Sequence, residues 1–370
     1  ATPYVGKILG LMNVKYVVLR NDLDEEGMGH KIRVKNSRLK GAIENQEGLS
    51  LARTFGDLSF YVNKWWSPSI YASWKAISVL GNISAIARMT YFEEMKLNPM
   101  PLFFVEQLKD DDRTEILRRS EMLIVYKGAA ELLKKLEKIT PDIRVLYLID
   151  PPNSFGAFTS LREDIYVPRQ GLYRLAVRLI EGYQSNQGRS LWAQIDNSSV
   201  MKANLEDNSV WIHFPPAYLQ EGNCSLMLTS RFVAWHVATL YSVNRSEEVR
   251  EVFRDVRDPP AICFSKINPT EFAVHVEAQE PFILLLTESF SPNWKAFVGN
   301  VEQHHLVGNS YANAYLIESK GNITLVYVSQ SFLVMGLSIS AIVVVTILIC
   351  LLEPWKRYRF VARILGRVST

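Results

Sequence analysis

Apolar and polar residues alternate along the middle of the chain. In Gly171–Leu179 and Ser190–Asp196, every second residue is apolar, which is the period of a strand with one buried face. The apolar positions are Tyr173, Leu175, Val177 and Leu179 in the first segment and Leu191, Ala193 and Ile195 in the second. Two further segments, Gly222–Ser230 and Trp235–Val243, continue the series with turn residues between them. Several short alternating strands of this kind predict a β-sandwich of the jelly-roll or immunoglobulin-like type.

The N-terminal part has a different pattern. The segment Glu121–Gly128 has an apolar centre typical of a buried strand, Ala129–Lys138 has helical spacing, and Asp142–Asp150 has the pattern of another strand. Strand, helix and strand at this spacing predict a βαβ unit and a small parallel sheet. We therefore expect residues 1–150 to form a mixed α/β domain.

Proline pairs mark where the pattern changes. Pro151-Pro152 follows the α/β part, and Pro259-Pro260 follows a charged segment that begins at Val249. Proline pairs are typical of linkers. The resulting fold class is α+β and multidomain, with an N-terminal α/β domain, two β-sandwiches and one C-terminal transmembrane helix. The expected boundaries are 1–150, 151–248, 249–330, 331–353 for the helix and 354–370 for a basic tail.

The third unit contains the most apolar strand of the chain, Pro281–Leu286, which is followed by the polar corner Thr287-Glu288-Ser289. We expect this strand to be buried and to leave the core at the corner. A turn at Ser291–Asn293 then brings back Trp294 and Phe297, which favours packing rather than a binding site at Trp294. Glu288 is the residue to test if the corner binds a ligand.

An uncharged apolar run covers Phe332–Leu352, and five basic residues follow it in the tail. Because about 20 apolar residues span a bilayer as a helix, the run predicts a transmembrane segment. The positive-inside rule then places the tail in the cytoplasm and residues 1–331 outside, with the lipid bilayer as a partner. The chain begins at Ala1 without a signal peptide, so the expected export requires a cleaved signal or upstream transmembrane segments.

Charge changes this interpretation little. The 370 residues carry a formal net charge of +3, of which +4 belongs to the tail, so residues 1–352 carry −1. A basic surface for nucleic acid is therefore not expected. The composition, 48% hydrophobic and 21% charged, is typical of a globular chain that buries a core.

Cysteines and sequons agree with an extracytoplasmic location. Cys224 and Cys263 lie in the part expected outside, where a disulfide between them is permitted; the alternative is two free thiols. Five sequons permit N-glycosylation, at Asn82, Asn197, Asn223, Asn244 and Asn322.

Motifs for catalysis are not found. The sequence has no P-loop, no complete GxGxxG, no GxSxG and no HExxH, and its acidic and histidine clusters lack metal-ligand spacing. We therefore expect no catalytic residue, no metal and no cofactor in this segment. A pair of carboxylates that meets in space, as in glycosidases, leaves no trace in the sequence and stays open.

One strand carries residues suited to sugar. Trp192, Gln194 and Asp196 occupy the face opposite Leu191, Ala193 and Ile195, and Trp211 lies nearby in sequence. An aromatic plane beside amide and carboxylate groups fits a sugar, whose CH face stacks and whose hydroxyls need partners. The alternative is that Trp192 covers the neighbouring domain or the other sheet.

Three stretches resemble a known family: Leu9–Asp24, Phe55–Ala72 and Ile267–Gly299, followed by the apolar run that opens at Phe332. They are similar to the C-terminal extracytoplasmic region of large GT-C-type membrane proteins, including YfhO-like proteins and arabinofuranosyltransferases of surface polysaccharide. The middle unit, with Asp164–Leu179, resembles carbohydrate-binding jelly rolls. The family's catalytic acid lies in an early loop among N-terminal spans that this sequence does not contain, so no catalytic residue is carried over.

Two functions follow as expectations. The first is a non-catalytic, membrane-anchored region of a glycosyltransferase or related assembly protein that contacts glycan or lipid-linked sugar. The second is a structural or interaction subunit of a membrane or cell-surface protein complex that makes protein contacts through its sandwiches.

Overall fold

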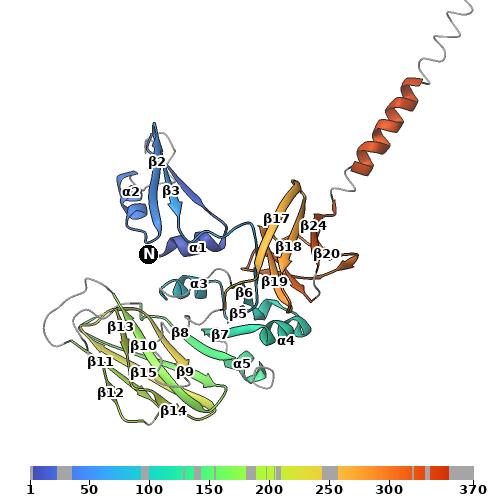
Figure 1. The fold of residues 1–370 in the computed structure, drawn as a ribbon. Coiled ribbons are helices and arrows are strands. Elements are labelled where there is room, and N and C mark those ends of the chain that lie inside the picture. The colour runs from blue at the N-terminus through green and yellow to red at the C-terminus, as the bar shows by residue number, and fades with distance from the viewer. Residues whose placement is uncertain are drawn as a thin grey trace, which may run out of the picture. The chain divides into compact units, whose positions relative to one another are not determined.

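The structure is a computed structural model of the chain. It describes residues 3–22, 36–92, 100–127, 130–136, 143–153, 156–180, 189–196, 198–203, 205, 210–243, 257–318, 321–329 and 334–349. The fold is β-rich, with several sheets and short helices (Figure 1). It divides into two compact units: Ala1–Ile262 with Val276–Phe290 and His304–Lys320, and Cys263–His275 with Ser291–Gln303 and Gly321–Thr370.

Four parallel strands form the α/β part of the first unit. They are β5 (Ala76–Leu80), β6 (Leu102–Phe104), β7 (Ser120–Tyr126) and β8 (Arg144–Ile149), in the order β6-β5-β7-β8. The connecting helices are α3 (Ser84–Met89), η1 (Val105–Gln107), α4 (Asp110–Arg118) and α5 (Ala130–Leu136). Alternate residues of β7 enter different core clusters, so both faces of the strand are buried, which explains its continuous apolar run. The predicted parallel βαβ unit is confirmed by the pairing of β7 with β8.

The same sheet continues past residue 150. β8 pairs antiparallel with β16 (Trp235–Ser242), which pairs with β10 (Gly171–Leu179). β13 (Trp211–His213) and β14 (Ala217–Leu219) both pair with β10. One sheet of eight strands thus joins residues on both sides of the first predicted boundary, and the boundaries at 150, 248 and 330 stay predictions.

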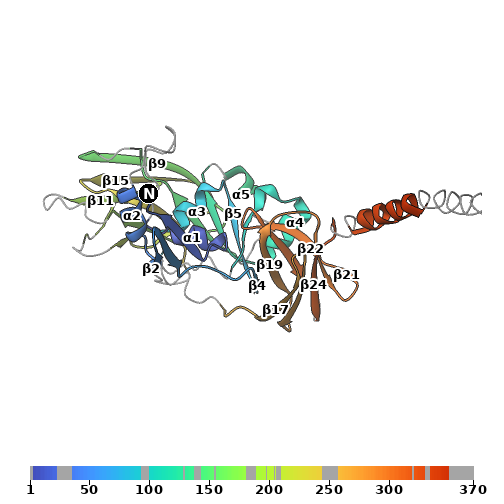
Figure 2. The same cartoon turned by 90° about the horizontal axis from the view of Figure 1, so that it is seen from above.

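A second sheet packs on this one as a β-sandwich. Its strands are β9 (Phe158–Val167), β11 (Ser190–Ile195), β12 (Met201–Lys202) and β15 (Gly222–Arg231), in the order β12-β11-β15-β9. Figure 2 shows β9, β15 and β11 side by side. Leu191, Ala193 and Ile195 share one core cluster with Tyr173, Leu175 and Val177 of the larger sheet, so the predicted alternation faces this core.

A three-stranded sheet lies near the N-terminus. It consists of β1 (Tyr16–Arg20), β2 (Leu49–Phe55) and β3 (Leu58–Asn63), in the order β1-β3-β2. α1 (Val5–Leu11) and α2 (Asn36–Glu44) complete this part.

The most apolar strand is β19 (Phe282–Ser289), and it is buried up to Thr287 and exposed at Glu288 and Ser289, as the sequence predicts. It lies in a four-stranded sheet with β22 (His304–Gly308), β23 (Ala312–Ile317) and β4 (Ile70–Ser73), in the order β22-β23-β19-β4. β4 comes from the first 150 residues and pairs with β19 from Ile70↔Leu286 to Ser73↔Ile283.

The second unit is built on a five-stranded sheet. Its strands are β17 (Ala261–Asn268), β18 (Glu271–Glu277), β20 (Trp294–Val298), β21 (Val301–Glu302) and β24 (Asn322–Tyr327), in the order β17-β18-β24-β20-β21. Trp294 is buried, with its ring 5.9 Å from Phe272 and 5.3 Å from Tyr327. The interpretation of Trp294 as a packing residue agrees with these contacts.

The predicted C-terminal span requires a correction. Residues 334–349 are helical. Within the described ranges, no helix is both long enough and apolar enough to cross a membrane. This finding contradicts the predicted single span at Phe332–Leu352 and the membrane localisation that depended on it. The tail at 354–370 lies outside the described residues.

Candidate functional site

The β12-β11-β15-β9 sheet of the sandwich carries two of the predicted sugar-binding residues, Trp192 and Gln194, on its outward face. Along β11, Leu191 and Ala193 are buried in the core, while Trp192 and Gln194 are half-buried on the opposite face. Trp192 lies opposite Thr229 of β15, and Gln194 lies opposite Met227. The period-two pattern of β11 therefore places an indole and an amide on one open surface.

A groove of about 310 Å³ lies along this face. It is lined by Phe158, Trp192, Ala193, Gln194, Val200, Met227 and Thr229. Three of the apolar lining residues are exposed: Phe158 at 65%, Val200 at 58% and Met227 at 37%. Exposed apolar groups beside amide and hydroxyl groups can stack on the CH face of a sugar ring and bond its hydroxyls.

Polar side chains of the face are partly engaged with one another. The Gln194 amide nitrogen donates to the Ser198 carbonyl at 3.1 Å, which orients the amide. The hydroxyls of Ser160 and Thr229 lie 3.2 Å apart. These bonds hold the polar groups in place, and the Gln194 amide oxygen has the acceptor capacity that a sugar hydroxyl requires.

Asp196 has a structural position at the end of β11. Its backbone φ is +50°, and its carboxylate accepts the Ser225 N–H at 2.6 Å while its own N–H donates to the Ser225 carbonyl at 2.7 Å. It therefore ties β11 to β15 at the strand end. Asp196 does not line the groove of Trp192 and Gln194.

Trp211 and Glu288 lie elsewhere. Trp211 belongs to β13 in the other sheet, where its ring stacks on Phe92 at 5.1 Å and lies 5.9 Å from the Arg178 guanidinium. Glu288 is exposed at the end of β19, and its carbonyl accepts the Asn313 amide at 2.9 Å. The structure thus brings together Trp192 and Gln194 but neither Trp211 nor Glu288.

The two cysteines are free thiols, so the permitted disulfide is not formed in this structure. Cys224 faces the sandwich core, where burial, followed by the nearby Asp196 carboxylate, raises the pKa of the thiol to about 12. Cys263 is exposed on β17. Of the sequons, Asn82, Asn223 and Asn322 are exposed, and Asn197 and Asn244 lie outside the described residues.

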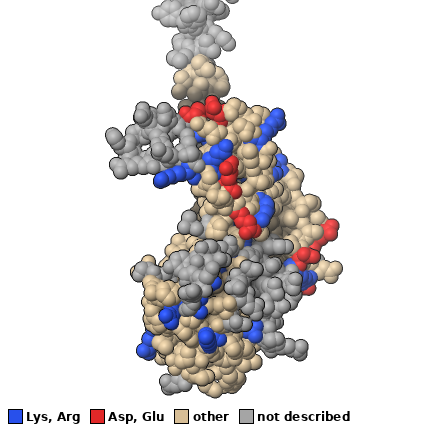
Figure 3. All heavy atoms as spheres, turned by 90° about the vertical axis from the view of Figure 1, so that its left-hand side faces the viewer, with Lys and Arg blue, Asp and Glu red and all other residues tan. Residues whose placement is uncertain are grey.

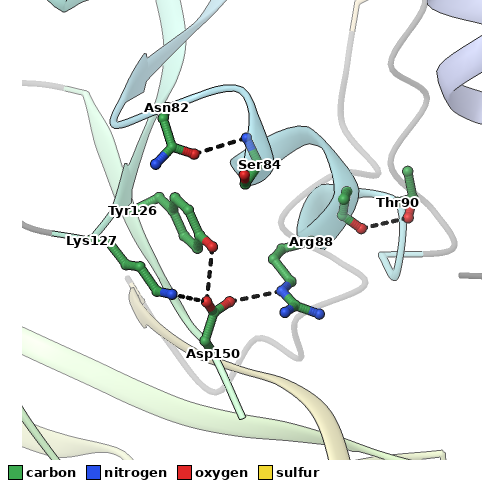
Figure 4. A network of polar contacts seen from close by, with 8 residues as sticks. Asn82, Ser84, Arg88, Thr90, Tyr126, Lys127 and Asp150 are labelled. Carbon is green, nitrogen blue, oxygen red and sulfur yellow. Dashed lines mark hydrogen bonds and ion pairs between the residues drawn. The ribbon is translucent and has the colours of Figure 1, made fainter. Parts of the chain in front are cut away.

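The carboxyl edge of the parallel strands is the other place where chemistry is common in such sheets. There the Asp150 carboxylate accepts the Arg88 Nε–H at 2.7 Å and the Tyr126 hydroxyl at 2.9 Å, and it also contacts the Lys127 ammonium (Figure 4). Burial alone would raise the pKa of Asp150, but Lys127, Tyr126 and Arg88 together lower it below its usual value. The acceptor is thus occupied by three donors of the protein, which is the geometry of a structural ion-pair network.

Among the residues that the structure describes, no three His, Cys, Asp or Glu side chains are grouped to hold a metal ion. Charged side chains on the face in Figure 3 stand in separate small groups. Sequence reasoning missed Phe158, Val200 and Met227 as neighbours of Trp192. The outward position of Met227 is readable from the alternation in β15, but the strand register that joins it to Trp192 is not.

Comparisons with known proteins give a limited result. The sequence matches no protein-family model and no curated protein. Among solved structures, the chain is similar to arabinofuranosyltransferase AftD from Mycobacteria, in a mutant form, with 14% identity over 38% of this chain and 12% of that chain and a TM-score of 0.30. A second AftD structure matches with 10% identity over 49% and 22% of the chains and a TM-score of 0.30.

A cycloisomaltooligosaccharide glucanotransferase of Paenibacillus sp. is also similar, with 10% identity over 58% of this chain and 53% of that chain and a TM-score of 0.20. The aligned parts thus span less than two thirds of each of these proteins.

Proposed function

We propose that this chain is a non-catalytic, glycan-contacting region of a GT-C-type glycosyltransferase or of a related protein of surface-glycan assembly. The observation that supports this best is the groove on the outward face of the sandwich, with Trp192, Phe158 and Gln194 in its lining. The proposal also draws on the resemblance of Asp164–Leu179 to carbohydrate-binding jelly rolls. Glycan lies along the sheet, with ring faces on the aromatic side chains and hydroxyls on Gln194 and Thr229.

The expected affinity is low. Stacking on an aromatic ring adds about 0.5–1.5 kcal/mol beyond area burial, and each neutral hydrogen bond contributes about 0.5–1.5 kcal/mol. After the cost of association, one such site has a dissociation constant on the order of 1 mM. Binding to a polymer with many sites compensates for this weakness.

The test compares retention on immobilised arabinan. Trp192→Ala is expected to abolish retention and to leave the thermal midpoint nearly unchanged, because the indole lies on the outward face. Phe158→Ala removes a side chain that is 65% exposed and gives an independent second measurement. Trp66→Ala removes an exposed indole outside the groove and serves as the control. Full retention by folded Trp192→Ala and Phe158→Ala proteins would contradict the proposal.

The alternative, a protein-interaction role, is favoured by the N-terminal three-stranded sheet. Tyr16, Val18 and Phe55 are 47–51% exposed, and the strand register puts them on one face. Exposed apolar faces of this kind mark interaction surfaces. If this face binds a protein partner, Val18→Asp is expected to abolish the association with that partner, measured by sedimentation. Retention on arabinan is expected to stay unchanged.

A further inference from the structure

A cleft of about 430 Å³ lies where the chain passes from β4 to β5. Its walls come from this junction, from the C-terminal end of α4, and from the residues just before β19. The side chains that matter below are Trp74, Lys75, Arg118, Glu121, Arg257 and Glu280. The volume lies in the range of small-molecule sites, and most of the lining residues are of charged types.

Trp74 forms part of the lining of this cleft. Its indole N–H donates to the Asp258 carbonyl at 2.8 Å, and the Arg257 guanidinium lies 4.2 Å from the ring centroid. Arg257 also donates to the Glu280 carboxylate at 2.9 Å. An aromatic ring, a stacked guanidinium and a carboxylate thus form one continuous surface.

Two basic side chains that also line the cleft lack a close partner. Arg119 is only 13% exposed and is bonded to Glu115 at 2.6 Å and to Glu318 at 2.9 Å, so its charge is compensated. Arg118 is 69% exposed and reaches the same Glu115 only at 3.8 Å. Lys75 is exposed and, within the ranges that the structure describes, has no polar side-chain partner. Two cations of the cleft are therefore open to an anion.

The acidic groups decide what kind of anion fits. Glu121 is exposed at the start of β7, and Glu280 completes the Trp74 wall. Carboxylates repel a simple ion such as phosphate, but they accept hydroxyl groups.

We propose that this cleft binds an anionic saccharide, a sugar that bears a carboxylate or phosphate group. Lys75 and Arg118 hold the acidic group through charge-assisted hydrogen bonds, and Glu121 and Glu280 accept hydroxyls along the Trp74 wall. The proposal concerns a different cleft from the groove of Trp192, and neither depends on the other.

The test is calorimetric titration of the full chain at low salt with hexagalacturonate, and with maltohexaose as the neutral probe of equal length. Glucose 6-phosphate, as a third probe, distinguishes phosphate from carboxylate as the acidic group. The Lys75→Ala/Arg118→Ala variant is expected to lose affinity for hexagalacturonate about tenfold or more, since it removes two charge-assisted bonds. The matched control, Arg20→Ala/Lys40→Ala, removes two exposed basic side chains outside the cleft and is expected to bind as the parent does.

Four outcomes with these probes and the control variant would overturn the proposal. They are equal binding of maltohexaose, an equal loss of affinity in the control variant, binding of inorganic phosphate as tight as that of hexagalacturonate, and binding of a hexaglutamate peptide as tight as that of hexagalacturonate. Trp192→Ala separates this cleft from the groove of the proposed function. It is expected to leave hexagalacturonate affinity unchanged, and a loss in that variant would assign the binding to the groove and contradict the inference.

Discussion

At the scale of single residues, Asp150 connects three elements of the parallel sheet. Its carboxylate is 15% exposed and bonds Arg88 of α3, Tyr126 of β7 and Lys127 just beyond β7. Lys127 has a φ of +34°, an uncommon conformation for a residue other than glycine. Because removing one partner of a mostly buried ion pair leaves the others unpaired, the network is sensitive to substitution.

The lowered pKa of Asp150 makes the free energy of unfolding depend on pH in the acid range. The folded state lowers the pKa of Asp150, so its stabilising contribution is complete above the unfolded pKa of about 3.9 and is lost as pH falls through the lower folded value. Asp150→Asn is expected to lower the free energy of unfolding by about 1–3 kcal/mol at pH 7 and to flatten its dependence on pH below about 4. Denaturant titrations across this pH range measure both effects.

Asp164→Asn is the control, because the Asp164 side chain is 80% exposed. An Asp150→Asn profile that runs parallel to the parent profile at acid pH would show that the network does not control this dependence.

Residue placement also shows how far the sequence predicts the candidate site. The outward position of Trp192 and Gln194 follows from the burial of Leu191, Ala193 and Ile195, because alternation is a local property of a strand. Asp196 departs from the alternation because β11 ends there and its backbone turns to positive φ. Trp211 is near Trp192 in sequence only, since the two belong to different sheets.

At the scale of elements, the passage from β5 to α3 depends on Gly81. Its φ is +124°, and a Cβ at this position would overlap with the Tyr126 carbonyl of the neighbouring strand. Only glycine adopts such a φ without strain and also lets the two backbones approach so closely.

Gly81→Ala is therefore expected to lower the free energy of unfolding by more than the roughly 1–3 kcal/mol of backbone strain alone. Gly171→Ala is the matched control, because a Cβ at Gly171 meets no atom within 4 Å. Urea denaturation of both variants measures the two losses in the free energy of unfolding. Equal losses would show that the close approach of Gly81 to the Tyr126 carbonyl is not the cause of the destabilisation.

In β10, tertiary packing overrides the alternation of buried and exposed residues. The alternation in β10 predicts an exposed Arg178, yet this residue is 2% exposed, and its guanidinium donates to the Tyr4 hydroxyl at 2.8 Å and to the Tyr91 carbonyl at 2.9 Å. The face of β10 opposite the sandwich core is covered by other parts of the chain, so period two no longer separates inside from outside. Such coverage is a tertiary property that a single strand does not encode.

At the scale of the whole first unit, segments that are far apart in the sequence pair and hydrogen-bond with one another. β4 pairs with β19 across more than 200 residues, and the Tyr311 hydroxyl donates to the Leu11 carbonyl at 2.7 Å. The sequence predicts β19 as a buried strand but does not reveal its partner β4, because pairing across such a separation leaves no local pattern. Fold class is therefore more predictable here than topology.

Asn309 links these distant parts most directly. Its side chain accepts the Leu102 N–H of β6 at 2.9 Å and donates to the Tyr71 hydroxyl of β4 at 2.9 Å, and the residue is 4% exposed. Asn309→Ala leaves both buried groups without these partners, so we expect a loss of about 2–4 kcal/mol in the free energy of unfolding. Because the first unit is expected to unfold cooperatively, amides of β4 and β6 lose protection from hydrogen exchange together with those of β22 and β23. Asn223→Ala, at an exposed position of β15, is expected to change neither quantity. Loss of protection in β22 and β23 alone, with β4 and β6 unchanged, would mean that these two pairs of strands unfold separately.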